Sequence, residues 1–266
     1  HLERLSSTSP LLLLLEGLSE EELQDLDDES ALLLRLHQIS RYCDVPVDAH
    51  PRVAASIDFF QTRGRATIAG WLQRAGRYRP MILRTLREEG VPEDLLHVAM
   101  IESGFNPNAY SPAHAAGMWQ FIQETGQREG LHRTHWLDER RDPPKATRAA
   151  ARHLRGLYAD LQDWRLALAA YNCGQKRVEK AIERAGTRDF WALDLPAETM
   201  NYVPLFMAAT AIDRDPRLFG FDPPEPDPPL EYDEVPLPAG TPYVDLRVAA
   251  DVLGVSYTQL RQLNPE

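Results

Sequence analysis

The chain has 266 residues and a mass of 30.1 kDa, enough for one large domain or two modest domains with a buried core. Hydrophobic residues make up 43% and charged residues 26%, a composition typical of globular proteins rather than disordered ones. A net charge of −11 and a pI near 5.2 argue against nucleic acid as the main partner. The longest uninterrupted aliphatic run, Leu11 to Leu15, is too short for a transmembrane segment.

Two features of the chain concern its cellular setting. No basic segment followed by an apolar core begins the chain, so no signal peptide is recognisable. Because the chain starts at His1 rather than Met, we expect that a native leader has been trimmed. Cys43 and Cys173 are too few for a disulfide framework or a four-cysteine zinc site. One bridge or two free thiols are both compatible with the sequence.

Helical patterning dominates from the N-terminus onward. Residues 1–48 are rich in leucine and acidic residues, and we predict an amphipathic helical extension that packs on the main domain. Pro92 begins a helix that should end near Ser103–Gly104. Three further helices are predicted over 143–162, 164–171 and about 175–185, with caps or stops at Asp142, Asp163, Gly174 and Gly186. No apolar strand with a period of two precedes residue 230, so the predicted fold is all-α.

The domain organisation follows from the distribution of proline. Eight of the 21 prolines lie between Pro223 and Pro242, in a stretch that is typical of a stiff, acidic linker. We therefore expect a helical extension (1–48), a main domain (49–222), a proline-rich linker (223–230) and a C-terminal piece (231–266).

Glu102 is the first candidate for chemistry. It lies in an apolar neighbourhood, where a predicted helix gives way to a Gly-Phe-Asn-Pro turn. Desolvation raises the pKa of a carboxyl group, and a carboxyl that keeps its proton near neutral pH can act as a general acid. The alternative is an exposed glutamate at the C-terminus of a helix.

Four motifs occur in order around this residue. They are ESGF at Glu102, NAYSPAHAAGMWQF up to Phe121, AAYNCG at Ala169–Gly174 and NYVP at Asn201–Pro204. In type, order and spacing they resemble the motifs of the lytic transglycosylases, relatives of goose-type lysozyme, across roughly residues 50–222. The resemblance implies a lysozyme-like catalytic domain. His114 and Cys173 are departures, at positions where the family commonly has glycine and alanine.

The resemblance also implies roles for individual residues. Glu102 matches the family's single catalytic acid/base. Ser111 matches the serine beside that glutamate and the substrate's acetamido group. The remaining matches line the glycan cleft or lie near the carboxyl group: Gly117, Met118, Gln120, Tyr171, Asn172 and Tyr202.

The implied reaction cleaves the bond between N-acetylmuramic acid and N-acetylglucosamine in peptidoglycan. Glu102 protonates the linking oxygen and then takes a proton from O6 of the muramic residue, which attacks C1 to give a 1,6-anhydro end. An intramolecular nucleophile can outcompete water because its entropy is already lost. Ordinary glycosidases use two carboxylates, and Glu124, Asp138, Glu139 and Asp142 are the nearby candidates for a second one, although caps or surface charges are the favoured interpretation.

Two other classes of function are compatible with an intact cleft. A muramidase would let water attack C1 in place of O6, and a glycan-binding or scaffold protein would keep the cleft without turnover. The intact set of motif residues disfavours the second class. For Trp119 and Phe121 core packing is favoured over a glycan platform, whereas for Gln120 the motif position outweighs a surface amide.

The expected partners are peptidoglycan glycan strands, acted on by a monomer that needs no metal and no organic cofactor. His132 and His135 without a third ligand are a weak metal signal. The seven arginines of residues 63–87 suggest either an anion-binding face or, more commonly, the solvated side of helices.

The C-terminal piece resembles the helix–helix part of a LysM module, a small peptidoglycan-binding fold, with Tyr232–Val235 as its first strand and its last strand missing. A helical hairpin that packs on the body is the alternative. The implied setting is the periplasm, with membrane attachment through a leader that this chain does not contain.

Overall fold

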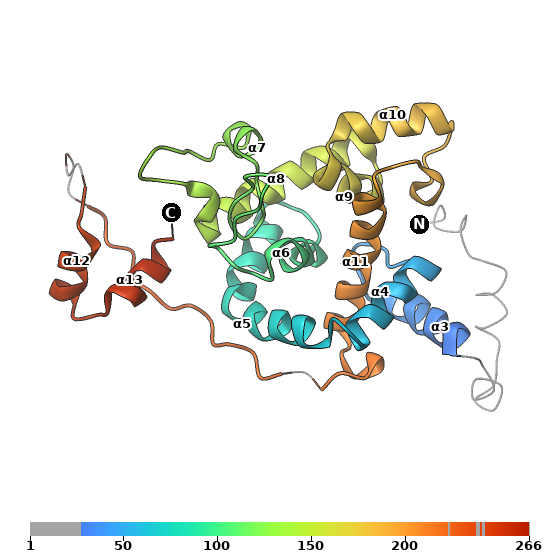
Figure 1. Cartoon of the computed structure of the whole chain (residues 1–266), viewed down its shortest axis with the longest axis horizontal. Coiled ribbons are helices and arrows are strands. Elements are labelled where there is room, and N and C mark those ends of the chain that lie inside the picture. Colours follow the sequence, from blue (N-terminus) through green and yellow to red (C-terminus); the bar gives the residue numbers. More distant parts are fainter. Residues whose placement is uncertain (1–27, 223, 238–239, 241–242, 266) are drawn as a thin grey trace.

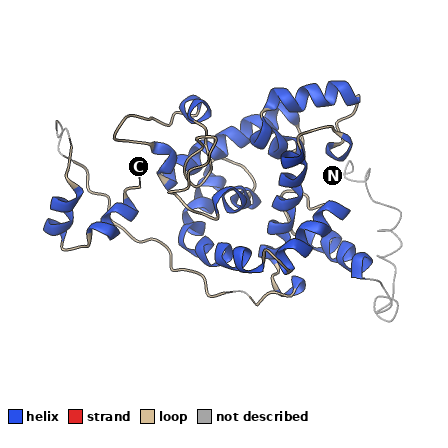
Figure 2. Cartoon of the chain, viewed as in Figure 1, coloured by secondary structure: helices blue, strands red, loops and turns tan. Residues whose placement is uncertain are grey.

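A computed structural model describes residues 28–222, 224–237, 240 and 243–265. The described residues form helices and connecting loops, with three isolated β-bridges and no sheet (Figure 2). The α-helices are α3 (Asp28–Ser40), α4 (Pro51–Gln61), α5 (Arg65–Glu88), α6 (Leu96–Ser103), α7 (Gln123–Arg128), α8 (Pro143–Leu161), α9 (Trp164–Cys173), α10 (Gln175–Ala185), α11 (Ala197–Arg214), α12 (Leu246–Leu253) and α13 (Tyr257–Leu263). Short 3-10 helices are η1 (Glu93–Leu95), η2 (Glu139–Arg141), η3 (Phe190–Ala192) and η4 (Arg217–Phe219). The all-α prediction is confirmed.

Side-chain caps explain where the predicted helices begin. Asp142 accepts a hydrogen bond from the Lys145 amide at the start of α8, and Asp163 accepts from Arg165 and Leu166 at the start of α9. Each carboxylate satisfies amide donors that the first turn leaves unpaired. Gly186, in the left-handed region with φ 65°, ends α10 as predicted.

One hydrophobic core holds α3 to α6 and α8 to α11 together. Figure 1 shows α6 near the middle of this helical body, between α5 and α11. The residues of α6 from Leu96 to Met100 are all buried, so the helix has no solvent-facing side along most of its length. A helix buried in this way is held by its neighbours, and this fixes the position of its C-terminal end, where Glu102 lies.

The N-terminal extension is described from residue 28 onward. There α3 buries leucine and isoleucine side chains, among them Leu36 and Ile39, against the core. The expected helical extension is therefore seen in this part, and residues 1–27 lie outside the described residues.

The proline-rich segment packs against the helical domain. Residues 224–230 lie along α5, where the amide of Asp227 donates to the Gln73 carbonyl (2.8 Å) and the amide of Leu230 donates to the Arg77 carbonyl (3.2 Å). Gly76 makes this approach possible, because a Cβ there would lie 2.4 Å from the Asp227 carbonyl oxygen. Figure 1 shows the segment running past α5 towards α12 and α13.

The C-terminal piece contains the two predicted helices, with Gly254 ending α12 at φ 67° and a capping box between Ser256 and Gln259 beginning α13. The expected strand at 232–235 is wrong: this segment has no regular structure. It finds no partner strand among the described residues, and an unpaired strand leaves its backbone groups to solvent.

Candidate active site

Glu102 occupies the last turn of α6. The helix ends at Gly104, whose φ of 59° is in the left-handed region. A Cβ on Gly104 would lie 2.3 Å from the ring of Trp71, so only glycine fits here. The Nε of Arg74 donates to the Gly104 carbonyl (2.8 Å) and holds this end of the helix against α5.

Tyr202 of α11 donates a hydrogen bond from its hydroxyl to Oε1 of Glu102, at 2.8 Å. Burial raises the pKa of Glu102 from 4.5 to about 7, the bond from Tyr202 acts in the opposite direction, and the charge of Glu198 adds to the rise. Part of the residue still reaches solvent, although its carboxyl group is desolvated. The proton-bearing carboxyl group expected from the sequence is therefore present, and the alternative of an exposed surface glutamate does not apply.

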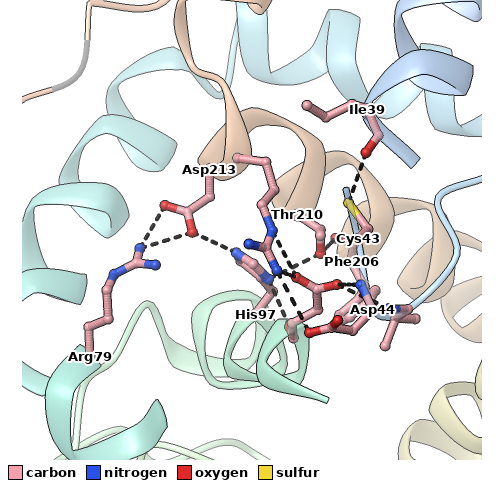
Figure 3. Close-up of polar contacts among 11 residues, drawn as sticks. Ile39, Cys43, Asp44, Arg79, His97, Phe206, Thr210 and Asp213 are labelled. Atoms are coloured by element: carbon pink, nitrogen blue, oxygen red, sulfur yellow. Dashed lines mark hydrogen bonds and ion pairs between the residues drawn. The ribbon is translucent and has the colours of Figure 1, made fainter. Parts of the chain in front are cut away.

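A polar network two turns further along α11 fixes α6 against it (Figure 3). The buried ring of His97 contacts Oδ2 of Asp213 (2.8 Å) through Nε2, and Oγ1 of Thr210 (3.1 Å) through Nδ1. Arg79 of α5 donates to both carboxylate oxygens of Asp213, at 2.7 and 2.9 Å. The bonds from His97 and the charge of Arg79 outweigh burial, so the pKa of Asp213 lies well below its usual range. Tyr202, Thr210 and Asp213 are eight and three residues apart on α11, spacings that place them on one face of the helix.

Arg140 holds the loop that follows α6. Its buried guanidinium donates from Nη1 to the carbonyls of His114 and Phe121, both at 2.9 Å, and pairs with Asp138 through Nε and Nη2. A Cβ on Gly117, whose φ is 84°, would lie 1.7 Å from the Arg140 carbonyl oxygen. The glycine of the second motif is thus required by the close approach of two backbone segments.

The polar side chains of the second motif bond to nearby backbone. Oγ of Ser111 accepts from the Ala115 amide (3.1 Å), which closes its own turn. Gln120, with φ 50°, donates from Nε2 to the Gly117 carbonyl (2.8 Å). Met118 is buried, and its carbonyl accepts a hydrogen bond from Ser103 of α6 (2.8 Å).

The third motif supports this loop from α9. Tyr171 donates to the Trp119 carbonyl (2.7 Å), and the charge of Glu102 adds to burial in raising the pKa of the Tyr171 phenol. Asn172 accepts from Thr199 of α11 (2.8 Å) through Oδ1. The structure therefore brings Glu102, Tyr171 and Tyr202 together. The side chains of Ser111, Gln120 and Asn172 instead form hydrogen bonds with residues other than Glu102.

Trp119 and Phe121 are fully or almost fully buried, which confirms their assignment to the core. The indole N–H of Trp119 donates to Thr147 (2.9 Å). His114 has φ 61°, which explains why glycine suits this position. Cys43 and Cys173 are both free.

The nearby carboxylates proposed as a second catalytic group have other partners. Asp138 pairs with Arg140, Glu139 pairs with Lys145 (2.8 Å), and Asp142 caps α8. Glu124 lies in the first turn of α7 and is exposed. Asp138 and Asp142 are caps and Glu124 is a surface charge, as expected, whereas Glu139 is buried and ion-paired.

Glu198 is a carboxylate whose charge acts on Glu102, and it is not among the residues predicted from the sequence. Its position four residues before Tyr202 on the same helix was the available signal, because residues four apart share a face. Ser103, Thr199 and Arg140 were also missed, since each acts by bonding to a segment distant in the sequence.

The arginines of residues 63–87 are largely engaged within the body. Arg79 binds Asp213, Arg74 binds Gly104, and Arg65 donates to the Gly220 carbonyl (2.7 Å). In the described ranges no group of three or more possible metal ligands is found, and no helix there is long and apolar enough to cross a membrane.

Residues 80–193 match the family model described as the Transglycosylase SLT domain. The resemblance to lytic transglycosylases is confirmed.

The chain is similar to membrane-bound lytic murein transglycosylase D of Escherichia coli (strain K12), with 36% identity over 196 residues, which are 72% of this chain and 43% of the relative. The chain thus spans less than half the length of this curated relative. Among solved structures, the 70 kDa soluble lytic transglycosylase Slt70 from Escherichia coli matches with 18% identity and a TM-score of 0.49 over 76% of this chain and 32% of that chain. The lytic transglycosylase Slt from Pseudomonas aeruginosa matches with 24% identity and a TM-score of 0.43 over 55% of this chain and 25% of that chain.

Proposed function

We propose that this chain is a peptidoglycan lytic transglycosylase, which cleaves the β-1,4 bond between N-acetylmuramic acid and N-acetylglucosamine and leaves a 1,6-anhydro end. The observation that carries the proposal is the desolvated carboxyl group of Glu102, with a pKa of about 7 and a hydrogen bond from Tyr202. The name of one relative, a lytic murein transglycosylase, supports the same substrate.

Glu102 serves first as an acid. Its proton goes to the linking oxygen as the bond from that oxygen to C1 of the muramic residue breaks, and the muramic acetamido group stabilises the electron-poor C1. A carboxyl group with a pKa near 7 suits this step, because it is protonated in a large fraction of molecules at neutral pH.

Glu102 then serves as a base. Its carboxylate takes the proton from O6 of the same sugar, and O6 forms a bond to C1. The proton lost in the first step is regained and no water is consumed, so a single carboxyl group suffices. The hydroxyl of Tyr202 stabilises the carboxylate between the two steps.

The other motif residues are proposed to form the glycan cleft. Tyr171 and Tyr202 flank the carboxyl group, and Ser111 lies in the turn assigned to the acetamido group. Gly117, Met118, Gln120 and Asn172 shape the cleft wall through the backbone contacts described above.

The domain boundaries and the setting belong to the same proposal. The catalytic domain covers 49–222, the helical extension 1–48, the linker 223–230 and a partial LysM-like, peptidoglycan-binding module 231–266. The enzyme acts in the periplasm, where murein is found, and the relative from Escherichia coli is named as membrane-bound.

Mass spectrometry of the soluble muropeptides released from purified peptidoglycan tests the proposal. We expect products one water lighter than reducing-end muropeptides, and none from Glu102→Gln. Glu124→Gln, at an exposed carboxylate of α7, is the matched control and should act like the wild type. Reducing ends would mean hydrolysis by a muramidase, and pelleting with the wall without release would mean a binding protein.

A further inference from the structure

A cavity of about 620 Å³ lies between α10 and the segment Asp194–Pro196 that leads into α11. Arg177, Lys180 and Arg184 line it from α10, at spacings of three and four residues that place them on one face of the helix. Glu102 does not line this cavity, so it is separate from the site described above.

The lining has an excess of positive charge. Three cations face it against two carboxylates, those of Glu183 and Asp194. Arg184 donates to the backbone carbonyl of Asp194 at 3.4 Å. Arg177 and Lys180 are exposed, and neither forms an ion pair with another residue in the part of the chain that the structure describes. The cavity thus offers two cations that a ligand could engage.

The cavity is linked to the third motif by one chain connection and one hydrogen bond. Gly174 joins α10 directly to the third motif at the end of α9. Across the cavity, Pro196 precedes Thr199, which bonds to Asn172 of that motif. Burial raises the pKa of Cys173, beside Asn172, and the nearby charge of Arg177 acts against that rise. The cationic lining of the cavity, on α10, therefore begins directly after the third motif.

We infer that this cavity binds the anionic peptide stem that the muramic residues of peptidoglycan carry on their lactyl groups, with Arg177 and Lys180 engaging its carboxylates. The inference rests on the proposed function, because the stem arrives attached to the glycan. An extended peptide spans roughly 3.3–3.6 Å per residue, so a stem of a few residues extends well beyond the sugar that carries it. Arginine and lysine pair with carboxylates through charge-assisted hydrogen bonds.

The test compares two substrates made from one wall preparation: uncross-linked glycan strands that carry their peptides, and the same strands stripped of peptides by an amidase. The full chain and the double variant Arg177→Gln/Lys180→Gln are assayed on both. Lys176→Gln is the matched control, a neutralised exposed lysine of α10 that does not line the cavity. Circular dichroism and thermal unfolding establish that the variants are folded.

We expect the double variant to lower kcat/KM on peptide-bearing strands on the order of tenfold, mainly through KM, relative to its effect on stripped strands. Added salt should reduce the preference of the wild type for peptide-bearing strands. An equal loss on both substrates, or no loss on either, would overturn the inference while leaving the proposed function intact. A wild type that releases product from neither substrate would overturn the proposed function and this inference with it.

Discussion

The hydroxyl of Tyr202 lies 2.8 Å from Oε1 of Glu102 and joins the last turn of α6 to α11. The two residues are 100 positions apart, so the bond depends on how the two helices pack. Burial raises the pKa of Glu102 and this bond acts against the rise, which leaves the group near neutrality, at about 7. The acid/base behaviour of the site is therefore set by packing as much as by the identity of the glutamate.

Tyr202→Phe removes the bond and keeps the burial. Because the bond lowers the pKa of Glu102, its loss should raise that pKa, and the acid then stays protonated to higher pH. We expect the alkaline limb of kcat to move upward by about one pH unit, since a hydrogen bond to a charged group contributes roughly 1.5–3 kcal/mol. Tyr171→Phe is the control, because its hydroxyl bonds to the Trp119 carbonyl. Equal shifts in the two pH profiles would contradict this account.

The stability of the protein should also respond to Glu102. The folded protein keeps the proton up to about pH 7, whereas the unfolded chain releases it near 4.5. The folded state binds more protons between these values, so this contribution to stability is present below about pH 4.5 and is lost as the pH rises to about 7. Glu102→Gln should be more stable than the wild type at pH 8 by about 3 kcal/mol, with little difference at pH 4.

Urea unfolding at the two pH values measures this difference. Glu124→Gln, an exposed glutamate of α7, should show the same stability relative to wild type at both. A stability gain of Glu102→Gln that does not depend on pH would show that shape, rather than charge, is responsible.

Gly117→Ala should damage the loop of the second motif. The new Cβ would lie 1.7 Å from the Arg140 carbonyl oxygen, in addition to the strain at φ 84°. Gly130→Ala isolates the strain, because its φ is 87° and nothing lies within 4 Å of its Cβ position. We expect a cost of about 1–2 kcal/mol for Gly130→Ala and a clearly larger one, with loss of activity, for Gly117→Ala. Similar losses of unfolding free energy would refute a role for the close approach.

Gly76→Ala should release the linker segment from α5. Its Cβ would lie 2.4 Å from the Asp227 carbonyl oxygen. Hydrogen exchange should then quicken at the amides of Asp227 and Leu230, which bond to α5. Gly70→Ala in the same helix meets only the end of Arg74, at 3.4 Å, and should stabilise the helix by about 0.5–1 kcal/mol without changing those amides. If Gly76→Ala left the exchange rates of these two amides unchanged, the linker segment would remain bound to α5 despite the added Cβ.

Local signals in the sequence predicted the helices well. The caps Asp142 and Asp163 and the stop at Gly186 are short-range chemistry, so α8, α9 and α10 begin at the predicted residues. Glu102 was also found, because an acidic residue between apolar ones is visible in one segment. The strand expected at 232–235 failed, since a strand needs a partner that no local pattern guarantees.

Long-range polar contacts were not predicted. His97, Asp213 and Arg79 come from three helices, and each is an ordinary polar residue until folding brings them together. Glu198 acts on Glu102 through space, and no motif marks it. The sequence therefore predicts Glu102 itself but not the polar residues that position it and shift its pKa.

Arg140 makes the loop of the second motif depend on a flat, forked cation. Its guanidinium satisfies two carbonyls and a carboxylate from separate directions at once. A lysine has its three donors on a single nitrogen and cannot reach all of these positions. Lysine in place of Arg140 would therefore preserve the charge and lose the hydrogen-bond geometry. The damage would appear as a displaced cleft wall in a protein whose net charge is unaltered.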